Sequence, residues 1–208
     1  MGSRPCSTLA ERTIRRTSLV RETSRSTNRE ALQMGSRFDV RRLAGMLFAT
    51  WYRLRGAGRV SGTSFIVRNP SLFRVEKGGS IRIGEGVMIE HGARIVARDR
   101  LVIGDDVYIG KNSTIIAFAP LHIGPRTLFG ENVSVHTEDH GPAGRRGDFL
   151  TDEVWIGEDS WIGAGTVVLR GSRIGDRSTI GANSVVRGHI PDDVLAVGAP
   201  AVVKRALG

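Results

Sequence analysis

Two of the five histidines, His136 and His140, lie four residues apart in the segment HTEDHGP, residues 136–142. Imidazole titrates near neutral pH, so a histidine in an accessible loop can take a proton from an attacking hydroxyl group. That chemistry is general-base catalysis, and it needs no covalent intermediate when the other substrate is already activated. A loop histidine without a chemical role is the competing interpretation for this segment. His91, His122 and His189 are expected to be surface residues.

The element that must position these histidines is a repeat with a period of six residues. From Ile83 to Gly188 an aliphatic residue recurs at this spacing, usually with glycine after it, whereas an amphipathic helix would repeat at three and four. We expect three hexads to form one triangular coil of about 18 residues, with five coils stacked in register and an irregular first coil from Val60 to Val75. A second, small or branched position also faces the interior: Val87, Ala93, Val107, Ser113, Thr127, Val133, Ser160, Thr166, Ser178 and Ser184.

The repeat is interrupted between Val135 and Ile156. Loops of this length inside a compact repeat are uncommon and often functional. His136 and His140 both lie in the interruption. We therefore predict an active-site loop over residues 136–153, within a β-helix domain that spans residues 60–208.

The charge of the chain is concentrated before this domain. Residues 1–60 contain 13 arginines and 4 acidic residues, whereas basic and acidic residues balance over the remainder, so the net charge of +9 belongs to the N-terminal part. The charge therefore gives no reason to expect a nucleic-acid partner. Residues 1–37 have the composition of a disordered basic arm, which also resembles that of a transit peptide.

Residues 38–59 are expected to contain an amphipathic helix. It would either dock on the β-helix or contact an anionic membrane surface through residues 38–55. The single cysteine, Cys6, excludes a disulfide framework and is typical of a reducing compartment. No run of 18 apolar residues is present, so we predict a cytoplasmic protein without a transmembrane span, with peripheral contact at the inner membrane surface as the alternative.

The C-terminal segment carries a family resemblance. Residues 153–205 contain WIGAG, IGANSVV and a closing VGAPAVVKR, and this combination resembles the hexapeptide-repeat acetyltransferases. The similarity covers residues 75–205 and is nearest to the maltose, galactoside and nodulation O-acetyltransferases and their polysaccharide-modifying relatives. It implies an all-β, left-handed parallel β-helix, a homotrimer, and acetyl-CoA bound between neighbouring subunits, without a metal.

The resemblance also implies roles for individual residues. His140 matches the catalytic base. Contacts with the acceptor are implied for Asn112, His136 and Trp161. Contacts with the pantetheine arm or the phosphates of acetyl-CoA are implied for Gly163, Ala164, Ala182, Arg187, Lys204 and Arg205, with Arg187 standing in for a family lysine that is absent here.

The expected function is transfer of acetyl from acetyl-CoA to a sugar hydroxyl of a cell-envelope or exported glycan. The usual N-terminal helical domain of the maltose and galactoside enzymes is missing or replaced, which argues against those free sugars as acceptors. An N-acyltransferase acting on an amino sugar is the alternative. A zinc hydratase of the γ-carbonic-anhydrase type would need His91 or His122 beside the two loop histidines, and the expected spacing is absent. A non-enzymatic scaffold is the remaining alternative.

Overall fold

The structure is a computed structural model that describes residues 47, 50, 60–62, 65–68, 72–141 and 148–208. The arm predicted over residues 1–37 lies outside these residues. The helix predicted over residues 38–59 also lies outside them, except for Leu47 and Thr50, which are helical. No helix in the described part of the chain is long and apolar enough to cross a membrane.

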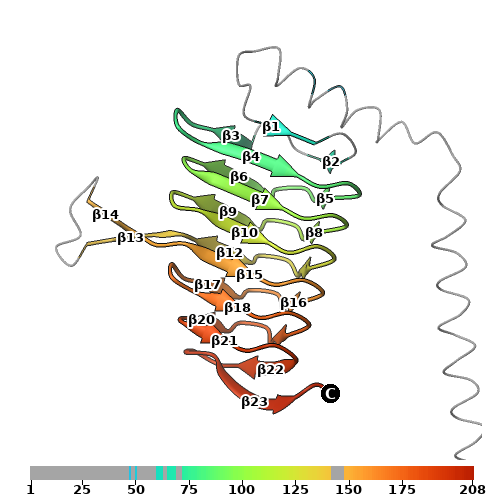
Figure 1. The fold of residues 1–208 in the computed structure, drawn as a ribbon, viewed down its shortest axis with the longest axis vertical. Coiled ribbons are helices and arrows are strands. Elements are labelled where there is room, and N and C mark those ends of the chain that lie inside the picture. The colour runs from blue at the N-terminus through green and yellow to red at the C-terminus, as the bar shows by residue number, and fades with distance from the viewer. Residues whose placement is uncertain (1–46, 48–49, 51–59, 63–64, 69–71, 142–147) are drawn as a thin grey trace, which may run out of the picture. The chain divides into compact units, whose positions relative to one another are not determined.

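From Val60 onward the described residues form a parallel β-helix with three faces, which we name sheets A, B and C (Figure 1). Sheet A contains β1 (Val60–Ser61), β4 (Ser80–Ile83), β7 (Arg100–Ile103), β10 (Leu121–Ile123), β15 (Val154–Ile156), β18 (Arg173–Ile174) and β21 (His189–Ile190). Sheet B contains β2 (Ile66–Val67), β5 (Met88–Ile89), β8 (Tyr108–Ile109), β11 (Leu128–Phe129), β16 (Trp161–Ile162), β19 (Thr179–Ile180), β22 (Val194–Val197) and the antiparallel β23 (Val202–Ala206). Sheet C contains β3 (Phe73–Val75), β6 (Arg94–Ala97), β9 (Thr114–Ala117), β12 (Ser134–His136), β17 (Val167–Val168) and β20 (Val185–Val186).

The coils wind in a left-handed sense, as the family resemblance implies. In Figure 1 the strands of sheet A run from left to right across the front, and the chain returns behind them as it descends. The repeat positions are in register from coil to coil: Ile83, Ile103, Ile123, Ile156, Ile174 and Ile190 are successive partners on sheet A. The predicted fold class of this domain is confirmed.

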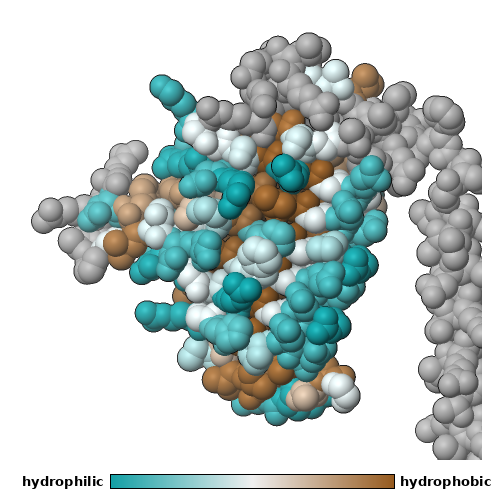
Figure 2. Space-filling model, viewed as in Figure 1, coloured by the Kyte–Doolittle hydropathy of each residue, from teal (hydrophilic) through white to brown (hydrophobic). Residues whose placement is uncertain are grey.

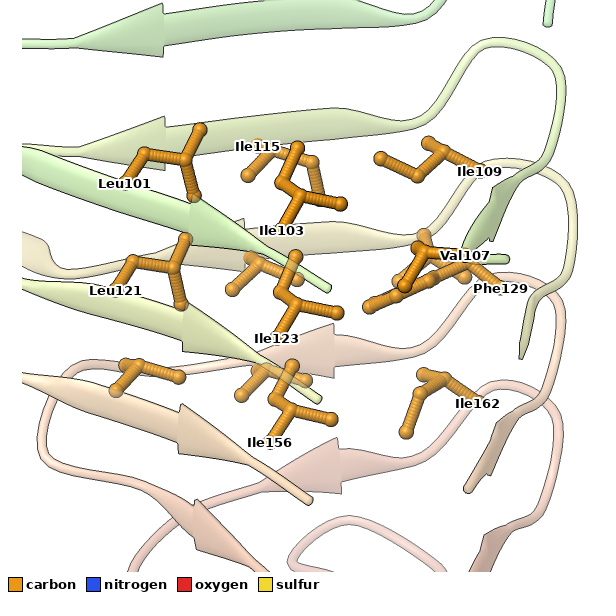
Figure 3. Packing of buried hydrophobic residues seen from close by; sticks show 14 of the residues in the cluster. Leu101, Ile103, Val107, Ile109, Ile115, Leu121, Ile123, Phe129, Ile156 and Ile162 are labelled. Carbon is orange, nitrogen blue, oxygen red and sulfur yellow. The ribbon is translucent and has the colours of Figure 1, made fainter. Parts of the chain in front are cut away.

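The first position of each hexad forms the core. Figure 3 shows Ile103, Ile123 and Ile156 one above another, with Leu101 over Leu121 beside them. These side chains are at most 1% exposed. Each aliphatic side chain therefore packs against its equivalents in the coils above and below, and burial of this column is the main source of stability.

The coil from Ile156 to Ile174 has the expected 18 residues, but two earlier coils are longer. The two coils from Ile83 to Ile123 contain 20 residues each. The reason is that the spacing from Ile95 to Ile103, and from Ile115 to Ile123, is eight residues and not six. The extra residues fall at the corner between sheets C and A, where they include Arg98 and Phe118. The segment that contains His140 leaves the β-helix at this same corner, between β12 and β15.

Buried hydroxyl groups join the coils in a second column. Ser160 is 1% exposed, and its hydroxyl donates to the carbonyl of Gly175 at 2.9 Å and accepts from the amide of Ser178 at 3.2 Å. Thr127 makes the same kind of bond to the carbonyl of Gly157 at 2.7 Å. The small polar residues at the second interior position therefore satisfy backbone groups that a purely apolar core would leave unpaired.

Replacement of Ser160 by alanine should lower the free energy of unfolding by about 1–3 kcal/mol, because two buried backbone groups lose a partner. Chemical denaturation of the purified variant measures this difference. Thr179→Ala is the matched control, because Thr179 lies on β19 and faces outward. A loss no larger than that of the control would show that the hydroxyl column does not support the core.

Candidate active site

The root of the active-site segment is fixed by one buried threonine. Thr137 is fully buried, and its hydroxyl accepts the amide N–H groups of Phe118 at 2.7 Å and Ala119 at 2.9 Å. Its carbonyl accepts the amide of Asp152 at 3.0 Å. The points at which the chain leaves and rejoins the helix are therefore both tied to Thr137.

Beyond this root the segment is a β-hairpin. Strands β13 (Glu138–His140) and β14 (Phe149–Thr151) pair antiparallel, with His140 opposite Phe149. The amide of Gly141 continues the ladder by donating to the carbonyl of Asp148 at 3.1 Å. In Figure 1 this hairpin, labelled β13 and β14, projects from the side of the β-helix.

His140 is exposed on this hairpin, and its ring packs on Phe149 with 5.0 Å between ring centroids. The adjacent carboxylate, Asp139, accepts the backbone amide of His140 at 2.8 Å. No described residue forms a hydrogen bond with the ring nitrogens of His140. Both nitrogens can therefore bind a substrate group, as a general base requires.

His136 has a different environment, because both of its ring nitrogens are engaged within the chain. Nε2 lies 2.8 Å from the hydroxyl oxygen of Ser134, and Nδ1 lies 2.8 Å from Oε1 of Glu138. An ionised Glu138 carboxylate accepts from Nδ1–H, and in that tautomer of the neutral ring Nε2 accepts from the Ser134 hydroxyl. Glu138 is nearly buried, and its other oxygen has no hydrogen-bond partner in the described part of the chain.

The sequence analysis did not identify Ser134 and Glu138. The sequence signal that could have identified them is their spacing, because Ser134 and Glu138 are each two residues from His136, and residues two apart on a strand share a face. A direct contact between His136 and the acceptor would have to replace one of these two hydrogen bonds.

The remaining predicted site residues, except Arg187, lie on sheet B or at the corner between sheets B and C, whereas Arg187 lies between β20 and β21 at the corner between sheets C and A. Trp161 faces outward from β16, where 47% of it is exposed, and it continues an outward row that contains Tyr108 and Leu128. Asn112 is exposed at the corner and has a φ of +56°. Asparagine tolerates this left-handed conformation, so the turn alone explains the residue type while leaving its side chain free for contact.

The corner residues predicted to contact the cofactor fall into two groups. Gly163 is buried, its amide donates to the carbonyl of Ile180 at 2.8 Å, and an added Cβ would lie 2.6 Å from the nitrogen of Ala182. Its glycine is therefore required by coil packing. Ala164 and Ala182 are exposed, and their amides donate to no backbone acceptor within the described ranges. These two N–H groups are thus outside the backbone ladder of the described residues.

The cationic candidates lie toward the C-terminal end of the β-helix. Arg187 is exposed directly after β20, and Lys204 and Arg205 are exposed on β23. The guanidinium of Arg205 donates to the carbonyl of Ala206 at 3.1 Å. All three side chains can reach an anionic group in solvent.

A single chain does not bring all of these residues together. His140 leaves from the corner between sheets C and A, whereas Trp161, Ala164 and Ala182 lie on sheet B or at the corner between sheets B and C. His140 and the two alanines thus belong to different corners of the triangular coil.

His122 departs from the expectation of a simple surface residue. It stacks on Trp155, with 3.8 Å between ring centroids and 17° between the planes, and burial together with Arg100 lowers the pKa of His122. The two rings border a shallow recess of about 230 Å³ on sheet A, the face shown in Figure 2. Stacked in this way, His122 does not meet the loop histidines, and the described residues contain no group of three His, Cys, Asp or Glu side chains placed to hold a metal.

Comparison with known proteins agrees with this architecture. The model "Bacterial transferase hexapeptide (six repeats)" matches residues 153–188, and "Hexapeptide repeat of succinyl-transferase" matches residues 100–119. A putative lipopolysaccharide biosynthesis O-acetyl transferase from Escherichia coli is 34% identical over 153 residues, which are 66% of this chain and 76% of that protein. The chain belongs to the hexapeptide-repeat acyltransferase family.

Another curated relative and two solved structures are also similar to this chain. The galactoside O-acetyltransferase of Lactococcus lactis is 39% identical over 107 residues, which are 50% of this chain and 52% of that enzyme. This chain therefore spans about half the length of that relative. A hexapeptide-repeat acetyltransferase from Vibrio cholerae, solved with acetyl coenzyme A, has a TM-score of 0.53 at 28% identity and covers 87% of this chain and 85% of its own. An N-acyltransferase from Bacillus cereus shares the fold with a TM-score of 0.61, at 20% identity, over 74% of this chain and 87% of its own.

Thr137→Val should release the hairpin from the helix, because the isosteric side chain leaves the amides of Phe118 and Ala119 without an acceptor. We expect a loss of about 1–3 kcal/mol in the free energy of unfolding. We also expect faster hydrogen exchange at these two amides. Thr151→Val, an exposed change on β14, is the control. Unchanged exchange at both amides in Thr137→Val would contradict the assigned anchor.

Proposed function

We propose that this protein is an acyl-CoA-dependent acyltransferase that moves acetyl from acetyl-CoA to a hydroxyl of a cell-envelope or exported glycan. The observation that carries the proposal is the hairpin at the break in the repeat, on which His140 is exposed and its ring nitrogens bond to no described residue. The names of the O-acetyltransferase relatives support the reaction class and the kind of acceptor.

The reaction follows from general-base chemistry. A ring nitrogen of His140 accepts the proton of the acceptor hydroxyl as its oxygen attacks the thioester carbonyl. A backbone N–H group stabilises the oxyanion of the tetrahedral intermediate. The C–S bond then breaks, and the proton passes from His140 to the leaving coenzyme A thiolate, so the ester product and free coenzyme A balance the reaction.

The residues around the corner between sheets B and C suit acetyl-CoA as co-substrate. The exposed amides of Ala164 and Ala182 supply donors for the amide-containing pantetheine arm. Lys204 and Arg205 on β23 supply positive charge for the phosphates, as does Arg187 at the corner between sheets C and A. Trp161 and Asn112 remain the proposed contacts for the acceptor.

We propose a homotrimer as the active assembly. Within one chain, His140 lies at the corner between sheets C and A, whereas Ala164 and Ala182 lie at the corner between sheets B and C. A cyclic arrangement would place the hairpin of one copy beside the corner of the next, and it would complete an identical site at every interface. The proposed location is the cytoplasm, as the cysteine usage suggests.

His136 is a second candidate for the base, because Glu138 orients its ring. The line from Ser134 through His136 to Glu138 has the hydrogen bonds of an activated acid–base group. Its ring nitrogens are, however, already occupied. We therefore assign His136 to the support of the site and His140 to proton transfer. The same base would serve an amino acceptor, so an amino sugar remains the alternative substrate.

His140→Ala should lower kcat by at least about 100-fold, the lower end of general-base contributions. Release of thiol from acetyl-CoA across a panel of neutral, acidic and amino sugars measures the rate and ranks the acceptors. His136→Ala, assayed in parallel, should lower kcat less. If His140→Ala keeps the wild-type kcat and His136→Ala loses most of it, the role of general base passes to His136. If neither variant loses kcat, the proposed mechanism is refuted.

A further inference from the structure

A general base must direct one nitrogen at the acceptor, yet nothing described so far orients the ring of His140. Rotation of a histidine ring about χ2 is only weakly restricted. Among the described residues no carboxylate bonds to the ring nitrogens of His140, and Asp139 accepts its backbone amide. The contact of the ring that the structure describes is with an aromatic side chain.

The packing partner is Phe149, which lies directly opposite His140 in the hairpin. The ring centroids are 5.0 Å apart, and the planes are inclined by 33°. Directly opposed residues of an antiparallel pair project on the same side, so this contact is built into the register. One side of the imidazole thus rests on a phenyl ring.

Phe149 is itself held by residues of the coils above. Its ring meets that of Phe118 edge to face, with 5.2 Å between centroids. The guanidinium of Arg98 lies 3.9 Å from the centroid of Phe118 and 6.0 Å from that of Phe149, and it pairs with Glu76. Such aromatic and cation–π contacts are favourable at these distances.

This line of contacts depends on the longer coils. Arg98 and Phe118 lie at the corner between sheets C and A, where each of the two upper coils contains two more residues than the regular spacing. A regular hexad is two residues shorter at this corner. The enlarged corner and the hairpin are thus parts of one arrangement.

We propose that Phe149 is a positioning residue that sets the orientation of the His140 imidazole, with Phe118 and Arg98 as its support. The inference rests on the proposed function, because it takes His140 as the base. The competing explanation is that Phe149 only covers apolar surface at the root of the hairpin. The two explanations predict different values of kcat for a variant in which an aliphatic side chain of similar size replaces the Phe149 ring. Only the positioning role predicts a loss.

The decisive variant is Phe149→Leu, assayed by thiol release with purified full-length protein. We expect kcat to fall about 10-fold, because small errors of orientation at a reacting centre are costly, with KM for acetyl-CoA unchanged. Phe149→Tyr, which keeps an aromatic ring, should retain nearly the wild-type kcat. Leu150→Ala is the matched control, because Leu150 is the next residue of β14, faces the other side and is 41% exposed against 37% for Phe149.

A double-mutant cycle separates an effect through His140 from a general effect on the fold. If Phe149 acts through His140, Phe149→Leu should cause no further loss in the His140→Ala background. An equal loss in both backgrounds, a wild-type kcat for Phe149→Leu, or the same loss in Leu150→Ala would each overturn the proposal. Should His140→Ala alone retain the wild-type rate, the proposed function would fail, which is a distinct result.

Discussion

The hydrogen-bonded register between successive coils is the constraint on which the rest of the molecule depends. Each strand pairs with the equivalent strand of the next coil, so a residue on one coil lies over its equivalent on the next. Aliphatic side chains can then stack as a continuous column, and buried hydroxyls can pair with carbonyls one coil away. The same register leaves only the corners free to vary, because a residue inserted in a strand would shift every side chain after it.

Functional groups accordingly gather at the corners. The corner between sheets B and C exposes the amides of Ala164 and Ala182, because residues at a turn are outside the ladder. The corner between sheets C and A takes up two extra residues in each upper coil and then the whole hairpin of His140. Where the hairpin begins, the Thr137 hydroxyl accepts the amides of Phe118 and Ala119. The coil after the hairpin then pairs in register with the coil before it.

Much of this arrangement could be predicted from the sequence. The hexads predicted the strands, the buried positions and the sheet faces, because the period is local and repeats many times. The spacing of eight residues from Ile95 to Ile103 and from Ile115 to Ile123 also marked the enlarged corner, but it was not used. The aromatic contacts of His140 could not be predicted from the sequence. Phe149 meets Phe118 only when the hairpin folds against the coil that contains Phe118, and the length of that coil had to be known first. The engagement of His136 by Glu138 likewise depends on the strand continuing past the repeat.

The division of the candidate site between two corners is the central claim about function, and mixed trimers test it most directly. Co-expression of His140→Ala and Ala164→Trp chains with different affinity tags, followed by purification on both tags, yields only assemblies that contain both defects. Each chain alone should be inactive. If the site forms between copies, about one of the three interfaces in every mixed trimer carries an intact His140 and an intact corner, so roughly one third of the wild-type kcat should return. Mixed assemblies that stay as inactive as either parent would show that the site is built within one chain.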